Sequence, residues 1–258
     1  MIQVEAIADD LRAKYNSDLL KFEEEFTYPF GKDRFRINHG KDYFNFFDLI
    51  GKPYIFVAFD KDKIVGIAIF VLRDQTENPF WYICDLKIAP EYRGKGIAEL
   101  IFLKAIKCKS ISDKIYGISM DSQMGENKLI NFSKKLKHLS LERKETLFFY
   151  IVQIKELETI SKYIEKRYGP YGFLSLSGTK DLVMQSNQEI YHLLHIVPEQ
   201  KSNKELSEIA CPDIMFCAES SSLTHQKMQE LGIRHACTAS VISNMDLPNW
   251  DWILSSEI

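Results

Sequence analysis

A glycine-rich turn that carries two basic side chains is the segment of the chain best suited to bind a charged ligand. Residues 93–98 are Arg-Gly-Lys-Gly-Ile-Ala, and they stand between an apolar run and a pattern of helical periodicity. A turn that enters a helix directs free backbone N–H groups and the helix dipole at one point, and glycines let the backbone approach a ligand closely. The segment predicts a phosphate or pyrophosphate site formed by Arg93, Gly94, Lys95, Gly96, Ile97 and Ala98.

Two common phosphate-binding fingerprints do not fit this segment. No Gly-x-Gly-x-x-Gly follows an expected strand, and no Gly-Lys-Ser/Thr closes a loop. The turn is preceded by Ala89-Pro90-Glu91-Tyr92 and has the spacing Arg-x-x-Gly-x-Ala. This longer pattern resembles the acetyl-CoA motif of the GNAT (Gcn5-related) N-acetyltransferases, and the resemblance covers about residues 1–153. The alternative interpretation is an ordinary basic turn between a strand and a helix.

The resemblance implies a mixed sheet flanked by helices, with acetyl-CoA wedged where two parallel strands separate. It also implies an acyl-CoA-dependent N-acetyltransferase, in which a primary amine attacks the thioester directly in a ternary complex. In the family, the strand before the turn binds the pantetheine arm through its main chain, and the matching residues here are Leu86, Lys87 and Ile88. Asn127 is expected either to bind the cofactor arm or to cap the helix that follows it.

Acetyl transfer requires an unprotonated amine and a stabilised thiolate leaving group. Asp85 is the first candidate for the base, because it lies on the strand expected to present the thioester. Asp121, at the end of the next strand, is the second candidate. The alternative interpretation, which the residue type alone favours, is that Asp85 is a solvated or salt-bridged strand residue. In the resembled family the first helices border the acceptor site, and the polar residues at that place here are Arg34, Arg36, His39 and Tyr43. The alternative interpretation is a solvated polar loop.

One position departs from the family pattern. The family often has a tyrosine that protonates the coenzyme A thiolate, and this chain has Ser133 at the matching position. Serine is a weak acid and is too short to replace a phenol, so Tyr82 and Tyr150 are the alternatives. A second interpretation therefore stays open, in which the chain is a catalytically weak acyl-CoA-binding module whose C-terminal domain binds a partner or substrate.

Apolar periodicity predicts the elements that position these residues. In residues 1–153, called the first half below, helices are expected at 5–25, 41–50, 98–109 and 126–139, and strands at 54–59, 64–72, 81–88, 114–120 and 145–153. In the second half, strands are expected at 173–177, 182–185, 190–197, 213–218 and 236–243, and helices at 202–210 and 221–231.

This order of elements predicts the fold class and the domains. The class is α/β, a mixed α+β sheet with a GNAT-like acyl-CoA-binding fold and an appended smaller α/β domain. The acetyltransferase domain spans residues 1–153, a linker helix and turn span 154–172, and the C-terminal α/β domain spans 173–258. We find no repeat of the first half in this last domain, and its sequence predicts no role.

Composition narrows the class of protein. The chain has 258 residues, 45% of them hydrophobic, and a net charge of −3, which gives no argument for nucleic acid. No apolar run approaches the ~20 residues of a membrane helix, and the N-terminus lacks the features of a signal peptide. Five irregularly spaced cysteines predict reduced thiols of a cytoplasmic protein and no metal site. The acceptor (small molecule, peptide or lysine) and the oligomeric state stay open.

Overall fold

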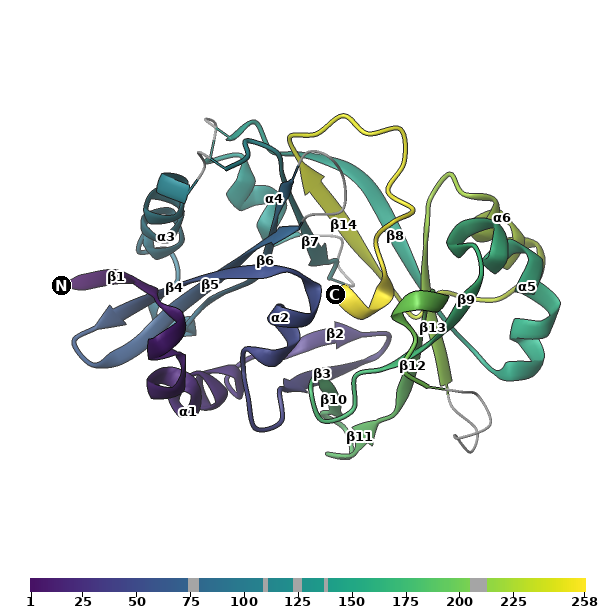
Figure 1. Cartoon of the computed structure of the whole chain (residues 1–258), viewed down its shortest axis with the longest axis horizontal. Helices are drawn as coiled ribbons and strands as arrows, with labels where there is room; N and C mark the ends of the chain where they lie inside the picture. Colours follow the sequence, from purple (N-terminus) through teal and green to yellow (C-terminus); the bar gives the residue numbers. More distant parts are fainter. Residues whose placement is uncertain (74–78, 109–110, 123–126, 137–138, 205–212) are drawn as a thin grey trace.

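The computed structural model describes residues 1–73, 79–108, 111–122, 127–136, 139–204 and 213–258. A large mixed sheet runs through the molecule, with helices on both faces (Figure 1). The first part of the chain forms β1 (Ile2–Ile7), α1 (Arg12–Glu23), β2 (Tyr28–Phe30), β3 (Asp33–Asn38), α2 (Asn45–Ile50), β4 (Lys52–Asp60), β5 (Lys63–Arg73), β6 (Phe80–Ile88), α3 (Ile97–Ala105), β7 (Ile115–Met120), α4 (Lys128–Ser133) and β8 (Glu142–Val152). The rest forms α5 (Ile154–Tyr168), β9 (Tyr171–Ser175), β10 (Asp181–Met184), β11 (Ile190–Tyr191), β12 (Leu193–Pro198), β13 (Asp213–Glu219), α6 (Leu223–Glu230) and β14 (Cys237–Ser243).

The large sheet has a repeating pattern of strand directions. Among the described residues its ten strands follow the order β1-β4-β5-β6-β7-β14-β8-β13-β12-β9. The middle strands β14 and β8 are antiparallel, and each pairs antiparallel with its outer neighbour, β7 or β13. Next come the parallel pairs β7–β6 and β13–β12, and then the antiparallel strands β5 and β9. The second half thus repeats the strand pattern of the first, a likeness that no repeat recognised in the sequence had indicated.

The last strand of the chain lies inside the sheet of the first half. β14 pairs with β7 on one side and with β8 on the other. An inner strand supplies both rows of backbone hydrogen bonds, so the two halves share one continuous sheet. The domain division at 154–172 stays a prediction. The helix expected there is α5, which begins at a capping box of Gln153 and Glu156 and ends before Gly169, at a φ of 69°.

A smaller sheet joins the halves at a second place. Its four strands, counted over the described residues, follow the order β11-β10-β3-β2. The register of β10 on β3 runs from Asp181 opposite Asn38 to Met184 opposite Phe35. Both edges of β3 are therefore paired, one with β2 and the other with the second half. This sheet lies below the large one in Figure 1.

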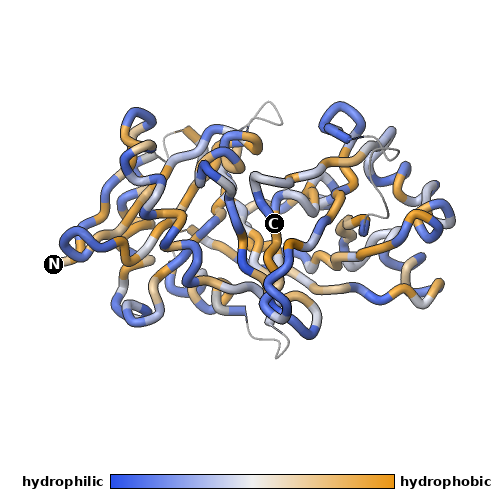
Figure 2. The backbone as a smooth tube through the Cα atoms, turned by 90° about the horizontal axis from the view of Figure 1, so that it is seen from below, coloured by the Kyte–Doolittle hydropathy of each residue, from blue (hydrophilic) through white to orange (hydrophobic). Residues whose placement is uncertain are grey.

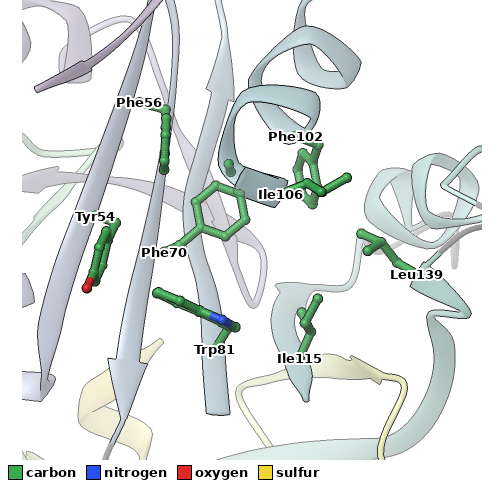
Figure 3. A pocket seen from close by; sticks show the side chains of 9 residues that line it. Tyr54, Phe56, Phe70, Trp81, Phe102, Ile106, Ile115 and Leu139 are labelled. Atoms are coloured by element: carbon green, nitrogen blue, oxygen red, sulfur yellow. The ribbon is translucent and has the colours of Figure 1, made fainter. Parts of the chain in front are cut away.

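Helices cover the sheet according to the alternation of its side chains. α3 packs Ile97, Ile101 and Phe102 on one face, whereas α1 and α2 pack on the other. Figure 3 shows Phe56, Phe70 and Trp81 directed from the strands toward α3, around a void of about 30 Å³. The residues around this void are aromatic and aliphatic, so it belongs to the apolar core and offers few hydrogen-bond partners. In Figure 2, apolar strands run through both halves and hydrophilic segments lie at the periphery.

Several predicted elements differ from the structure. Residues 5–7 belong to strand β1, which pairs with β4, so the helix predicted at 5–25 is shorter. β2 and β3 were not predicted, because strands of three and six residues leave little periodicity to recognise. Within the helix predicted at 202–210, the loop residue Lys204 instead bridges to Phe173. The helices predicted at 98–109, 126–139 and 202–210 also extend into residues outside the described ones.

Candidate active site

A cavity of about 680 Å³ connects the glycine turn to the space between the two halves. It exists because β6 and β7 pair only from Trp81 to Ile83, opposite Ile115 to Gly117. Beyond these residues the parallel strands separate, and the main chain of residues 84–88 borders the opening. Leu86, Lys87 and Ile88 all line it, so the structure brings the predicted pantetheine-binding residues to the cavity.

The glycine turn forms one end of this cavity. Gly94 and Gly96 have φ angles of 77° and 75°, which residues with a Cβ rarely adopt. Gly96 is also the N-cap of α3, so the free N–H groups of the first helical turn lie at the cavity. A Cβ built on Gly94 meets no atom of the described residues within 4 Å. The left-handed backbone therefore requires glycine here, and the space above the turn is free for a ligand.

The basic side chains of the turn differ in their contacts. The Nε of Arg93 donates to the carbonyl oxygen of Ile88 at 3.2 Å, which holds the guanidinium beside the end of β6. The Nζ of Lys95 lies 4.5 Å from the centre of the Tyr92 ring. Arg93 and Gly94 line the cavity with Ile97 and Ala98, whereas Lys95 is not among its described lining residues.

Asp85 lies at an irregular point of β6. The register with β5 shifts between Ile67 and Ile69, and Asp85 has a φ of 55°. Such a conformation costs a non-glycine residue about 1–3 kcal/mol. It places the Asp85 carboxylate in an ion pair with Lys87 and in a hydrogen bond from the Tyr43 hydroxyl. Burial raises the pKa of Asp85, but the charge of Lys87 and the hydrogen bonds from Lys87 and Tyr43 lower it by more, so the net pKa falls below its usual range.

A second carboxylate completes the buried charged cluster. Glu23, at the end of α1, forms an ion pair with Lys87 and accepts a hydrogen bond from Tyr28 at 3.4 Å. Only 2% of Glu23 and 5% of Lys87 is exposed to solvent. Burial raises the pKa of Glu23 to about 7, even though Lys87 lowers it. The cluster therefore holds Asp85 as the ionised partner of Lys87 and Glu23 as the carboxylate that titrates near neutral pH.

His39 and Lys180 meet at the far end of the cavity, and both line it. His39 follows β3, whereas Lys180 precedes β10 in the second half. Burial lowers the pKa of His39 to about 3 and the pKa of Lys180 to about 8. The Nζ of Lys180 donates to the main-chain oxygen of Ile258 at 2.6 Å. The predicted acceptor neighbours Tyr43 and His39 thus lie together, whereas Arg34 and Arg36 are turned to Thr27 and Gln188.

Sequence reasoning did not identify Glu23 or Lys180 as site residues. Glu23 stands in an ordinary charged helix run, and Lys180 is 95 positions after the Asp85 whose charge reaches it. Local spacing does not indicate such contacts. They follow from the packing of α1 under β6 and from the pairing of β10 with β3.

Asp121 and Asn127 form a junction between β7, α4 and β14. The Asp121 carboxylate accepts hydrogen bonds from Thr238, Ser240 and Asn127, at 2.9, 2.7 and 2.9 Å. The Asn127 side chain accepts from the backbone N–H groups of residues 129 and 130, which caps α4. Neither residue is among the described lining of the cavity. The capping alternative for Asn127 is confirmed. The Asp121 carboxylate joins the ends of β7, α4 and β14 through its hydrogen bonds.

None of the candidate acids presents an uncommitted hydroxyl to the cavity among the described residues. Ser133 is 5% exposed, and its hydroxyl donates to the carbonyl of Ile130 at 2.9 Å. Tyr82 lines the cavity, but its hydroxyl donates to the main-chain oxygen of Glu257 at 2.8 Å. The Tyr150 hydroxyl lies 2.7 Å from Nδ1 of His225 in the core of the second half.

Residues 17–136 match the model of the Acetyltransferase (GNAT) family. This part of the chain is a GNAT acetyltransferase domain. The match contains the second part of α1, the strands around the opening, the glycine turn and all of α4. It ends before β8, and it leaves out the second half.

A solved structure extends the GNAT likeness to the rest of the chain. A tandem GNAT protein from the clavulanic acid biosynthesis pathway is 9% identical, with a TM-score of 0.52, and the alignment covers 97% of this chain and 100% of that one. At that identity the likeness shows the fold alone. It agrees with the repeated strand pattern, so the fold is a mixed α/β sheet built from two GNAT-like halves.

Other solved structures cover just over half of this chain. Naa50 of Arabidopsis thaliana, in complex with a bisubstrate analogue, is 18% identical with a TM-score of 0.38, over 56% of this chain and 85% of that one. The ribosomal-protein-S18-alanine N-acetyltransferase of Escherichia coli is 10% identical with a TM-score of 0.39, over 57% and 81%. No curated protein matches the chain.

The described segments contain neither a membrane-spanning helix nor a metal-binding cluster. None of the helices in the described segments combines the length and apolar character needed to cross a bilayer. Over the same segments, no group of three or more His, Cys, Asp or Glu side chains is placed to hold a metal ion.

Proposed function

We propose that the protein is an N-acetyltransferase that transfers the acetyl group of acetyl-CoA to a primary amine by direct attack in a ternary complex. The observation that carries the proposal is the single cavity that joins the glycine turn, the separated strands and the buried charged cluster. One end suits an anionic cofactor and the other end has the charged groups that an amine requires. The family match over residues 17–136 supports acetyl-CoA as the co-substrate.

The first half supplies the cofactor contacts in this proposal. Backbone N–H groups from Gly94 to Ala98 bind the pyrophosphate, with Arg93 beside them. The main chain of residues 86–88 binds the pantetheine arm, and one of its N–H groups stabilises the oxyanion that forms at the thioester carbon. The reaction then requires that the amine lose its proton, that its lone pair attack this carbon, and that the thiolate depart.

The acceptor is a compact amine rather than a peptide segment. A peptide that binds by adding a strand needs an unpaired strand edge, and both edges of β3 are already paired. The walls beside the charged cluster are aromatic, with Phe26, Phe46 and Phe47 among them. Lys180 and Ile258 of the second half close this end.

A catalytically weak acyl-CoA-binding module is the second candidate. The bond from Ser133 to the carbonyl of Ile130 favours it, because that hydroxyl is committed within its own helix. In that case the cofactor end of the cavity would bind acyl-CoA without transferring the acyl group. The C-terminal half would then supply the surface for a partner or substrate.

One pair of assays separates the two candidates. Coenzyme A release is measured over a panel of small amines and short peptides, and acetyl-CoA binding is measured in parallel by calorimetry. We expect binding together with turnover of at least one small amine. Binding without release over the whole panel would support the binding module, and absence of binding would contradict both candidates.

A further inference from the structure

His39 is a buried imidazole that lines the cavity. It is 3% exposed, and among the described residues neither ring nitrogen has a partner within ordinary hydrogen-bond distance and angle limits. The main chain of Thr179 lies close enough to raise the pKa of the ring, so its contact there is a weak one. The ring packs 4.7 Å from the Tyr43 ring and 5.8 Å from the Phe47 ring, measured between centroids. A buried imidazole held this weakly keeps hydrogen-bonding capacity for a group of the bound acceptor.

Glu23 lies directly behind this imidazole. Nε2 of His39 is 3.9 Å from Oε2 of Glu23, and both side chains are only 2% exposed. Glu23 is not among the described residues that line the cavity, whereas His39 is. A proton from an acceptor in the cavity can thus reach Glu23 by way of the imidazole.

The other charged groups at this end have partners already. Asp85 is held by Lys87 and Tyr43. Glu257 forms a two-pronged ion pair with Arg73, at 2.5 and 2.7 Å. We propose that His39 takes a proton from the attacking amine and passes one to Glu23, so that the two residues form the proton route of acetyl transfer. This inference rests on the proposed function, since it concerns the amine of that reaction.

Each proton released along this route is accepted by a named group. The N–H bond of the acceptor ammonium breaks and leaves its electron pair on nitrogen, one imidazole nitrogen gains that proton, and the other releases one to the Glu23 carboxylate. Burial keeps His39 neutral and so able to accept, and Glu23, with a pKa of about 7, is ionised above neutral pH. The charges that face the pair are Asp85, Lys87 and Lys180. Turnover is therefore expected to rise with pH through about 7 and then to level.

The test compares His39→Gln and Glu23→Gln with matched exposed controls, His192→Gln and Glu24→Gln. The readout is kcat for coenzyme A release at saturating amine, using the best amine of the panel. We expect His39→Gln to lower kcat by roughly 10²-fold and Glu23→Gln to remove the rise near pH 7. Acetyl-CoA affinity should stay within about threefold of wild type in both, as judged against the controls.

The wild-type enzyme provides a second measurement if a variant does not fold. kcat is recorded against pH with two amines whose own pKa values differ by about two units. A rise near pH 7 with both amines supports the route, and a rise that follows the pKa of each amine overturns it. A His39→Gln variant that is folded and keeps both kcat and the pH profile also overturns it. Absence of turnover with every amine contradicts the proposed function itself, which is a separate outcome.

Discussion

The loops that follow β6 in the first half and β12 in the second half begin with similar residues and end with different ones. β6 continues into Pro90 and Glu91 and a short 3-10 turn, and β12 continues into Pro198 and Glu199 and a similar turn. A basic residue follows in each loop. The first loop then turns through Gly94 and Gly96 with positive φ angles, whereas the second continues through Ser202 with a φ of −69°.

The loop after β12 is hydrogen-bonded to the neighbouring strand β9. The Ser202 hydroxyl donates to the carbonyl of Phe173 at 2.9 Å, and the Phe173 N–H donates to that hydroxyl at 3.2 Å. A Cβ built on Gly172 would lie 2.6 Å from the Cβ of Ser202, so loop and strand are in close contact. The cavity beside His195 and Met215 measures about 30 Å³ and is lined by residues of both halves, whereas the cavity at the glycine turn measures about 680 Å³. Two similar scaffolds thus differ in the one turn that suits a pyrophosphate.

The two halves therefore contribute differently to the candidate site. The first half has the cofactor turn, and the second half contributes Lys180 and the paired strand β10 to the acceptor end. A chain with two GNAT-like halves is therefore expected to hold one acetyl-CoA.

Removal of the second half should have the largest effect. A fragment of residues 1–153 lacks β14, so β7 and β8 lose the strand that lies between them. We expect this fragment to lose both cooperative thermal unfolding and acetyl-CoA binding, as measured by circular dichroism and calorimetry. A folded fragment with wild-type affinity would show that the halves are independent domains, as the sequence alone suggested.

Gly96→Glu should abolish acetyl-CoA binding while the protein stays folded. The substitution forces a side chain into a φ of 75° and adds negative charge beside Glu99 and the expected pyrophosphate. Gly232→Glu is the matched control, because Gly232 has a φ of 69° and open space around it in the second half. Equal affinity of the Gly96 and Gly232 variants in calorimetry would contradict the assignment of the turn.

Arg93→Ala should weaken acetyl-CoA binding by roughly 10-fold to 100-fold, which corresponds to the loss of about 1.5–3 kcal/mol for a charge-assisted contact. Lys201 holds the comparable place in the second loop. Lys201→Ala should leave the affinity unchanged. A loss of similar size in the Lys201 variant would mean that the second loop also binds the cofactor.

Ser133 should matter least for turnover. Ser133→Ala removes a hydroxyl that bonds within its own helix, so coenzyme A release should change by less than about threefold. Ser133→Tyr would restore the residue that the family often has at this position. Because Ser133 is buried, the larger side chain should lower the thermal stability, by about 1–3 kcal/mol. A folded tyrosine variant with faster coenzyme A release would contradict this expectation and would show that a phenol at this position can act as the acid.

The sequence was informative where function depends on consecutive residues. The turn at 93–98 and the strands on either side of the opening were predicted, because periodicity and glycine placement are local signals. The insertion of β14 between β7 and β8 was not, since strand pairing over about ninety residues leaves no local pattern. The same holds for Glu23 and Lys180, whose surroundings are set by packing between distant segments.

The number of acetyl-CoA molecules bound per chain tests the central claim most directly. It can be measured on the full chain by calorimetry and by native mass spectrometry, with Gly96→Glu as the variant that closes the first site. We predict one acetyl-CoA per wild-type chain and none in the variant. Two molecules per wild-type chain, or one retained by the Gly96→Glu variant, would contradict the account.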